Sequence, residues 1–336
     1  MIDWSKGIVA KYYATMVDPK TWRDIETFDI IGGSITFSNS GVRGSADIDC
    51  MSFDHENEHW IRIYLDAKQN NEGERVPLFT GLASSPDIKY NGRIQNSKVQ
   101  CFSSLFPAEK KYLPLGWYAQ AGTNGAIAIK DLLTDVTPAP VVIDGSSQSI
   151  VSNIVAESDE TSLTMVDKLL NAINWKIYIE GNGTIHIAPF TNTISAVFGR
   201  EGNDILEMDV TISNNWDEIP NVFRAVGSGI ASIAKDEDPN SRFSIINRGR
   251  EIWAQDTNCI LNNGEKISDY AERRLKELQK VSKTIDYTRR FIPNVRIDDY
   301  VFLKYPEQNI SGPFLIESQT INLGYGGQVS EKVIGY

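Results

Sequence analysis

The residues with the clearest chemical potential form the run His55-Glu56-Asn57-Glu58-His59, which matches the H-E-x-x-H pattern of zinc peptidases. In such a site one helical turn brings both imidazoles to a metal ion and places the glutamate beside the metal-bound water. A zinc site also needs a third protein ligand, and the chain has one further histidine, His186. A zinc metallopeptidase is therefore one candidate function, provided that residues 55–59 are helical.

The residues on both sides of this motif argue against a helix. Residues 45–53 alternate between apolar and polar side chains, with Ala46, Ile48 and Cys50 on one face, and residues 60–65 alternate as well. A period of two is typical of β-strands, so the motif is expected at the tip of a hairpin, and His186 belongs to a different hairpin. We therefore predict no bound metal at His55 and His59.

No other catalytic pattern is complete. Gly227-Ser228-Gly229 follows a predicted strand but lacks the third glycine of a dinucleotide-binding loop. The G-x-S-x-G elbow of α/β-hydrolases is absent from the sequence. The 44 acidic residues are too many to single out a catalytic pair. We therefore predict a protein that is not an enzyme and that needs no cofactor.

Composition and charge exclude two further classes. The formal net charge of −11 disfavours tight binding to nucleic acid, which requires clustered lysine and arginine. The long uncharged stretch 112–129 contains Pro114, Gly116 and Gly122, so it is not a membrane helix. The start of the chain has neither the basic residues nor the apolar run of a signal peptide. Three cysteines lie far apart in the sequence, which favours buried free thiols in a reducing cytoplasm, with one disulfide as the alternative.

The pattern of elements divides the chain into three parts. Residues 1–105 read as short strands separated by turns, which is typical of a sandwich or barrel. Residues 106–195 read as a small α/β insert, with one helix over 126–133 and another capped by Thr161 or Ser162. A hairpin follows that helix and turns at Gly181-Asn182-Gly183. Strands dominate again over residues 196–336.

The clearest helix covers residues 269–282 and leads directly into a strand. It carries one apolar stripe at helical spacing: Ala271, Leu275, Leu278 and Val281. Strands are expected to follow at 285–291, 300–304, 314–323 and 328–334. We therefore expect this helix to bury its stripe against the antiparallel C-terminal meander.

Several short motifs, in their order along the chain, resemble those of the tail-hub or baseplate-hub proteins of phages with contractile tails, especially phages of Gram-positive hosts. They include Leu78-Phe79-Thr80-Gly81-Leu82-Ala83 and Leu113-Pro114-Leu115-Gly116-Trp117-Tyr118-Ala119. Others are Asn174-Trp175-Lys176-Ile177, Pro220-Asn221-Val222-Phe223-Arg224-Ala225-Val226-Gly227 and Ile321-Asn322-Leu323-Gly324-Tyr325-Gly326-Gly327. The resemblance covers nearly the whole chain.

This resemblance implies a β-rich α+β fold with two tail-tube-like β-barrel domains, at 1–105 and 196–336, and an α/β insert at 106–195. It implies a homotrimeric ring that joins the sixfold tail tube to the threefold tip or spike in a virion baseplate, assembled in the host cytoplasm. The implied partners are the tube, spike, tape measure and other baseplate proteins, with DNA passing through the central channel without being bound. A bacteriocin that resembles a phage tail could use the same hub.

Within that picture, the helix at 269–282 would cover the outer wall of the second barrel. Tyr270, Arg273 and Arg274 would then lie near the contact with a neighbouring subunit. Besides the zinc peptidase, the remaining alternative is a carbohydrate-binding or receptor-binding tail module, which requires exposed tryptophans along one cleft.

Overall fold

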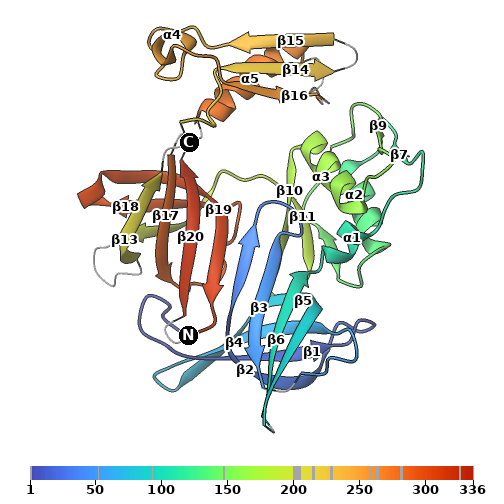
Figure 1. The fold of residues 1–336 in the computed structure, drawn as a ribbon, viewed down its shortest axis with the longest axis vertical. Coiled ribbons are helices and arrows are strands. Elements are labelled where there is room, and N and C mark those ends of the chain that lie inside the picture. Colours follow the sequence, from blue (N-terminus) through green and yellow to red (C-terminus); the bar gives the residue numbers. More distant parts are fainter. Residues whose placement is uncertain are drawn as a thin grey trace.

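The computed structural model describes residues 2–51, 53–92, 94–146, 148–199, 206–213, 216–227, 230–257, 259, 261, 265–280, 283–324 and 327–335. The described residues are mostly in strands, and the elements form four groups in Figure 1. Within this part of the chain, no helix combines the length and the apolarity needed to cross a lipid bilayer. Cys50 and Cys101 are buried free thiols, as predicted, whereas the free thiol of Cys259 is only partly buried.

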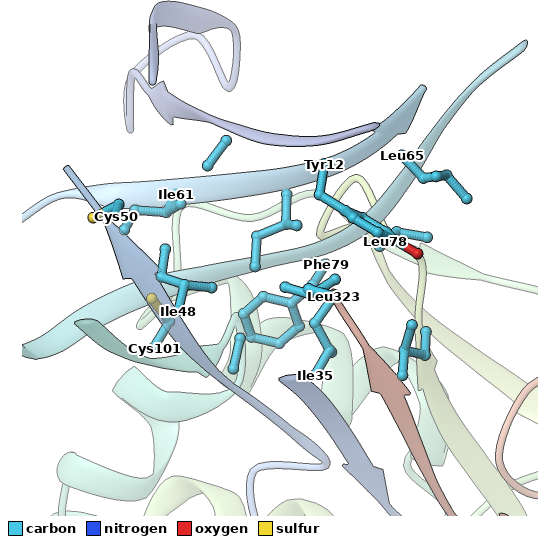
Figure 2. Packing of buried hydrophobic residues seen from close by; sticks show 14 of the residues in the cluster. Tyr12, Ile35, Ile48, Cys50, Ile61, Leu65, Leu78, Phe79, Cys101 and Leu323 are labelled. Carbon is cyan, nitrogen blue, oxygen red and sulfur yellow. The ribbon is translucent and has the colours of Figure 1, made fainter. Parts of the chain in front are cut away.

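The first group is six antiparallel strands whose pairing order, β1-β4-β5-β6-β3-β2, returns from β2 to β1. The strands are β1 (Val9–Val17), β2 (Asp24–Ser38), β3 (Gly44–Cys50), β4 (Trp60–Gln69), β5 (Glu72–Asn91) and β6 (Ile94–Ser103). Their alternating apolar side chains point inward and form one core, which includes Ile35, Ile48 and Phe79. Leu323, from the other end of the chain, packs into the same core (Figure 2).

The second group lies within residues 106–195, the range predicted as an insert. It contains α1 (Phe106–Lys110), β7 (Tyr118–Ala119), α2 (Gly125–Thr134), β8 (Val141–Ile143), β9 (Ile154–Val155), α3 (Ser162–Ile173), β10 (Trp175–Ile179) and β11 (Ile185–Pro189). Thr161 caps α3 by accepting a hydrogen bond from the Thr164 backbone N–H, and Asn174 ends the helix in the left-handed conformation. Both predicted helices and the hairpin β10–β11 are therefore confirmed, and together they enclose a separate core.

The third group is the C-terminal sheet, with the order β12-β18-β19-β20-β17-β13. Its elements are β12 (Ile194–Gly199), β13 (Leu206–Ser213), β17 (Lys283–Arg290), β18 (Tyr300–Tyr305), the 3-10 turn η1 (Pro306–Gln308), β19 (Ile310–Asn322) and β20 (Gln328–Gly335). All neighbours are antiparallel except β12 and β18. Because β19 also pairs with β2, the described strands of the first and third groups form one continuous sheet of twelve strands.

The fourth group lies between β13 and β17 in the sequence and forms a unit with its own core. It contains β14 (Val222–Gly227), β15 (Ile230–Lys235), α4 (Ile245–Arg248), β16 (Trp253–Asp256) and α5 (Ile267–Lys280). We call this unit, residues 216–280, the β13–β17 module. Figure 1 shows it standing beyond the ends of the C-terminal strands.

The expectation that the helix at 269–282 packs on the C-terminal meander is wrong. Helix α5 instead buries Ala271 and Leu275 against Phe223 of β14 and Ala234 of β15, and Leu278 packs at the edge of that core. The stripe correctly predicts which face of the helix is apolar. Periodicity does not identify the sheet that accepts this face, because β14 and β15 offer an apolar surface as suitable as the meander. Val281, the last residue of the predicted stripe, lies outside the described residues.

Candidate assembly surface

The H-E-x-x-H motif lies in the loop between β3 and β4, as the flanking strands predict. The His59 Nε2 atom is 2.8 Å from the Asp54 carboxylate, and the imidazole packs edge-on against Phe53. Hydrogen bonds from Asn57, from His59 and from the Glu56 backbone lower the pKa of Asp54 to about 2. Because no helical turn brings His55 beside His59, the loop lacks the geometry that a zinc peptidase requires.

The residues predicted at a subunit contact all lie on α5. Tyr270 is buried in the core of the β13–β17 module, and its hydroxyl donates a hydrogen bond of 2.5 Å to the Asp256 carboxylate. Burial, followed by this bond, raises the pKa of Tyr270 well above its usual value. Tyr270 is therefore a core residue of the module, and its place near a subunit contact stays a prediction.

The two arginines beside Tyr270 remain on the surface, where carboxylates of the same chain pair with them. Arg273 Nε lies 2.9 Å from Glu265 and Arg273 Nη1 lies 3.1 Å from Glu277, while Arg274 Nη1 lies 2.7 Å from Glu277. The bond to Glu265 is the main cause of a raised pKa for Arg273. Both side chains are 39% exposed, so the structure leaves them accessible to a neighbouring molecule.

A surface that sequence reasoning missed runs across the shared sheet. One row of directly opposed residues consists of small hydroxyl side chains, none of which is fully buried: Ser45, Thr36, Thr320, Ser330 and Thr288. We call these five residues the hydroxyl row. Hydroxyl oxygens of neighbours lie 3.3 Å apart between Thr36 and Thr320 and 3.2 Å apart between Thr288 and Ser330.

The next row of opposed residues points to the other face of the sheet and is buried: Ala46, Ile35, Ile321, Val329 and Arg289. This contrast follows from the alternation of side chains along each strand. The hydroxyl row crosses five strands, three of them contributed by the C-terminal sheet, so it spans roughly 19 Å at the usual strand separation. The pairing of β2 with β19 is therefore what makes the polar face continuous.

Acidic side chains extend this polar face over β3 and β5. Asp47 pairs with Ser34 and with Gln100, and Asp49 and Asp87 are both paired in register with Lys98. The Lys98 Nζ atom is 3.9 Å from the Asp49 carboxylate, a weak surface contact. Three carboxylates and one lysine therefore give this part of the face a negative balance.

The insert is fixed to the N-terminal strands by its hairpin turn. The Asn182 carbonyl accepts hydrogen bonds from the Trp22 indole (2.9 Å) and from Arg62 (3.0 Å), and the Gly181 carbonyl accepts one from Thr80 (2.8 Å). A Cβ atom at Gly181 would lie 1.9 Å from the Pro77 carbonyl oxygen, so only glycine fits there. The sequence predicts this turn, but not the surface that receives it.

The insert also contacts the C-terminal strands. The Lys176 ammonium, 7% exposed, donates a hydrogen bond of 2.9 Å to the Asp298 carbonyl and lies 3.6 Å from the Asp299 carboxylate. Arg296 lies over the Tyr178 ring, and the Tyr178 ring is stacked with the His186 ring. His186, the third histidine, thus forms part of this contact, and its Nδ1 atom lies 2.8 Å from Asp144.

Comparison with known proteins supports the resemblance seen in the sequence. No family model and no curated protein sequence matches the chain. Among solved structures, the 43 kDa tail protein of prophage MuSo2 from Shewanella oneidensis superposes with a TM-score of 0.69 at 14% identity, over 97% of this chain and 98% of that one. A tail protein of Neisseria meningitidis MC58 gives 0.70 at 14% identity, over 96% of each chain.

A third similar structure is the Escherichia coli c3393 protein, described as a component of the type VI secretion system with structural similarity to the T4 tail proteins gp27 and gp5. Its TM-score is 0.51 at 8% identity, over 92% of this chain and 74% of that one. These likenesses extend over nearly the whole chain and include both the insert and the C-terminal strands. The chain therefore has the fold of these two phage tail proteins and of the type VI secretion component.

Proposed function

We propose that this protein is the structural hub of a phage baseplate, in which three copies form a ring around a central channel. The observation that carries the proposal is the hydroxyl row, because it joins the N-terminal and C-terminal strands in a single polar face. A chain that contributes two sheet segments to one face supplies six segments to a ring of three. Such a ring matches a sixfold tube on one side and a threefold tip on the other.

In this proposal residues 1–105 and 196–336 are the two tube-like barrel domains, and residues 106–195 are the α/β insert. The closed pairing cycle of β1 to β6 supports the first barrel. The second is supported by the core beneath β12, β17, β18 and β19, while the β13–β17 module extends from one of its hairpins. The insert touches both groups of strands and so sets the angle between them.

The polar face suits the wall of a channel through which DNA passes. Serine and threonine hydroxyls bind water readily and offer no positive charge to phosphate groups. The carboxylates of Asp47, Asp49 and Asp87 repel the DNA backbone and so prevent it from adhering. DNA is thus in transit and not a bound ligand, and the same surface would serve a bacteriocin, through which no DNA passes.

The hub role implies contacts with the tail tube protein, the spike or tip protein, the tape measure protein and other baseplate proteins. We propose that Arg273 and Arg274 take part in the contact between subunits, since both are exposed on α5. When the arginines leave Glu277 and pair with a carboxylate of the neighbouring subunit, little free energy is lost, because exposed ion pairs contribute about 0–1 kcal/mol.

The two alternative functions have less support. The zinc peptidase requires the H-E-x-x-H motif on a helix, and the motif lies on a loop. The described residues contain no group of three or more potential metal ligands. The receptor-binding module requires exposed tryptophans along one cleft; Trp60 and Trp175 are buried in two different cores, which leaves the exposed Trp216 and Trp253 of the β13–β17 module as its candidates.

Sedimentation velocity of the purified chain, alone and mixed with its tube and spike partners, tests the proposal. A species with the mass of three chains is expected, and Arg274→Ala should weaken it at low salt more than at high salt. Lys276→Ala, on an exposed position of the same helix, is the matched control and should leave assembly unchanged. A chain that stays monomeric in every mixture would contradict the hub role.

A further inference from the structure

A cavity of about 110 Å3 lies where the N-terminal strands, the insert and the C-terminal strands meet. Much of its wall is apolar: Val76, Leu78, Ile179, Phe291, Ile297 and Ile321. These side chains come from β5, from β10, from the segment between β17 and β18, and from β19. The cavity is therefore formed by all three parts at once and is separate from the hydroxyl row.

One polar group in the wall lacks a partner. Arg43 lines the cavity and is 8% exposed. Its Nη1 donates to the Asn39 carbonyl at 2.6 Å and its Nη2 donates to Asp167 at 2.5 Å, but its buried Nε has no hydrogen-bond acceptor among the described residues. Gln319, also in the wall, differs because its amide donates to Val295 and to Glu331. A buried N–H group without an acceptor is unfavourable unless a bound molecule supplies one.

We propose that this cavity is a binding site for a small neutral organic molecule, which has an apolar body the size of one six-membered ring and one hydrogen-bond acceptor for Arg43 Nε. The size follows from the volume: an apolar cavity of ~150 Å3 accommodates benzene, and this cavity, at about 110 Å3, has room for no more than one such ring. Neutrality follows from charge balance. Both arginines of the wall already have a carboxylate partner, Arg43 in Asp167 and Arg296 in Glu180, and a further carboxylate would bury an uncompensated negative charge.

The position of the site has a mechanical consequence. A ligand there touches the N-terminal strands, the insert and the C-terminal strands simultaneously. Because a ligand that binds only the folded arrangement stabilises it by mass action, occupancy makes the junction of the three parts harder to open. This inference concerns one chain and holds whether or not three copies form a ring.

Ligand-observed NMR titration with phenol and with benzene, together with thermal melting, tests the site. Phenol has an oxygen that can accept from Arg43, so the wild-type chain should bind phenol about tenfold more tightly than benzene and should melt at a higher temperature with phenol present. Arg43→Lys keeps the positive charge beside Asp167 but removes Nε, so it should abolish the preference. Arg62→Lys is the matched control, because Arg62 is 6% exposed, donates hydrogen bonds from all three nitrogens and does not line the cavity. In this variant the preference for phenol over benzene should persist.

A second variant keeps the proposal testable if the arginine variants fold poorly. Val76→Phe places a ring inside the cavity and should abolish binding of both ligands, while circular dichroism confirms that the chain remains folded. The proposal is overturned if neither ligand binds the wild-type chain, or if Val76→Phe still binds both. It is equally overturned if phenol and benzene bind with the same affinity, because the unpartnered Arg43 nitrogen then selects nothing.

Discussion

The buried ion pair between Arg289 of β17 and Glu331 of β20 gives the sharpest test of how the C-terminal sheet is stabilised. Neither side chain is exposed to solvent, and the guanidinium binds the carboxylate through Nη2 at 2.7 Å and Nε at 2.9 Å. Gln319 donates to the same carboxylate at 2.6 Å, and the Tyr287 hydroxyl donates to it as well. Burial, reinforced by the adjacent carboxylate, raises the pKa of Tyr287, so this hydroxyl remains a donor at neutral pH.

Replacing Arg289 with methionine removes the positive charge and leaves the Glu331 carboxylate buried beside two neutral donors. Breaking a fully buried pair in this way costs about 3–5 kcal/mol. At about 2–4 °C per kcal/mol for a unit of this size, the C-terminal sheet should melt about 10 °C lower. The methionine side chain can keep the packing against Phe198, on which the guanidinium now lies 4.9 Å from the ring centroid, so loss of volume is a minor part of the change.

Thermal melting followed by circular dichroism at pH 7 measures this effect. The double variant Arg289→Met with Glu331→Leu removes both charges and should recover most of the lost stability, since apolar replacements of buried pairs are often neutral. Adding Tyr287→Phe should recover more, because the tyrosine hydroxyl would otherwise be buried without an acceptor. A melting temperature unchanged in Arg289→Met, or a double variant as unstable as the single one, would refute the reasoning.

Three further predictions follow from individual contacts. Leu275→Ala should lower the free energy of unfolding of the β13–β17 module by about 2–5 kcal/mol, and hydrogen exchange should show reduced protection in β14 and β15 while β17 to β20 stay protected. Equal loss of protection in both regions would contradict the separate core of the module. Gly181→Ala should destabilise the chain by about 1–3 kcal/mol because its Cβ overlaps the Pro77 carbonyl, and limited proteolysis should then cut the hairpin turn faster than in a control Gly7→Ala, where nothing lies within 4 Å of the added atom. Asp54→Ala should lower the melting temperature at pH 7 but not near pH 2. The folded pKa of Asp54 is about 2, so its carboxylate stabilises the fold above the unfolded pKa and loses that effect as pH falls through about 2. An equal change in melting temperature at both pH values would exclude this cause.

Local periodicity predicts much of this fold because each signal depends on neighbouring residues. Alternation around His55 and His59 identifies two strands and therefore a loop between them. Thr161, with Thr164 three residues later, sets the start of α3. The turn at Gly181-Asn182-Gly183 is likewise a local feature, since glycine permits the positive φ of 86° at Gly183.

Contacts between distant residues are not predictable in this way. The sequence correctly predicts the apolar stripe of α5. It does not predict that the stripe packs on β14 and β15, because several sheets in the chain could receive the same stripe. The hydroxyl row depends on β2 pairing with β19, and Thr36 and Thr320 are 284 residues apart. The burial of Arg43 against Asp167 depends on how α3 of the insert packs, which no local pattern gives. The order of the short motifs along the chain indicates the family resemblance, but it predicts none of these contacts.

A cryo-electron microscopy map of the assembled chain tests the central proposal most directly. We expect three copies around one axis, with Thr36, Thr320 and Ser330 of each copy facing an open channel and α5 on the outside. Thr320→Arg should leave this ring intact while adding positive charge to the channel wall. A map in which the hydroxyl row is buried against another subunit, or in which it faces outward from the ring, would contradict the account.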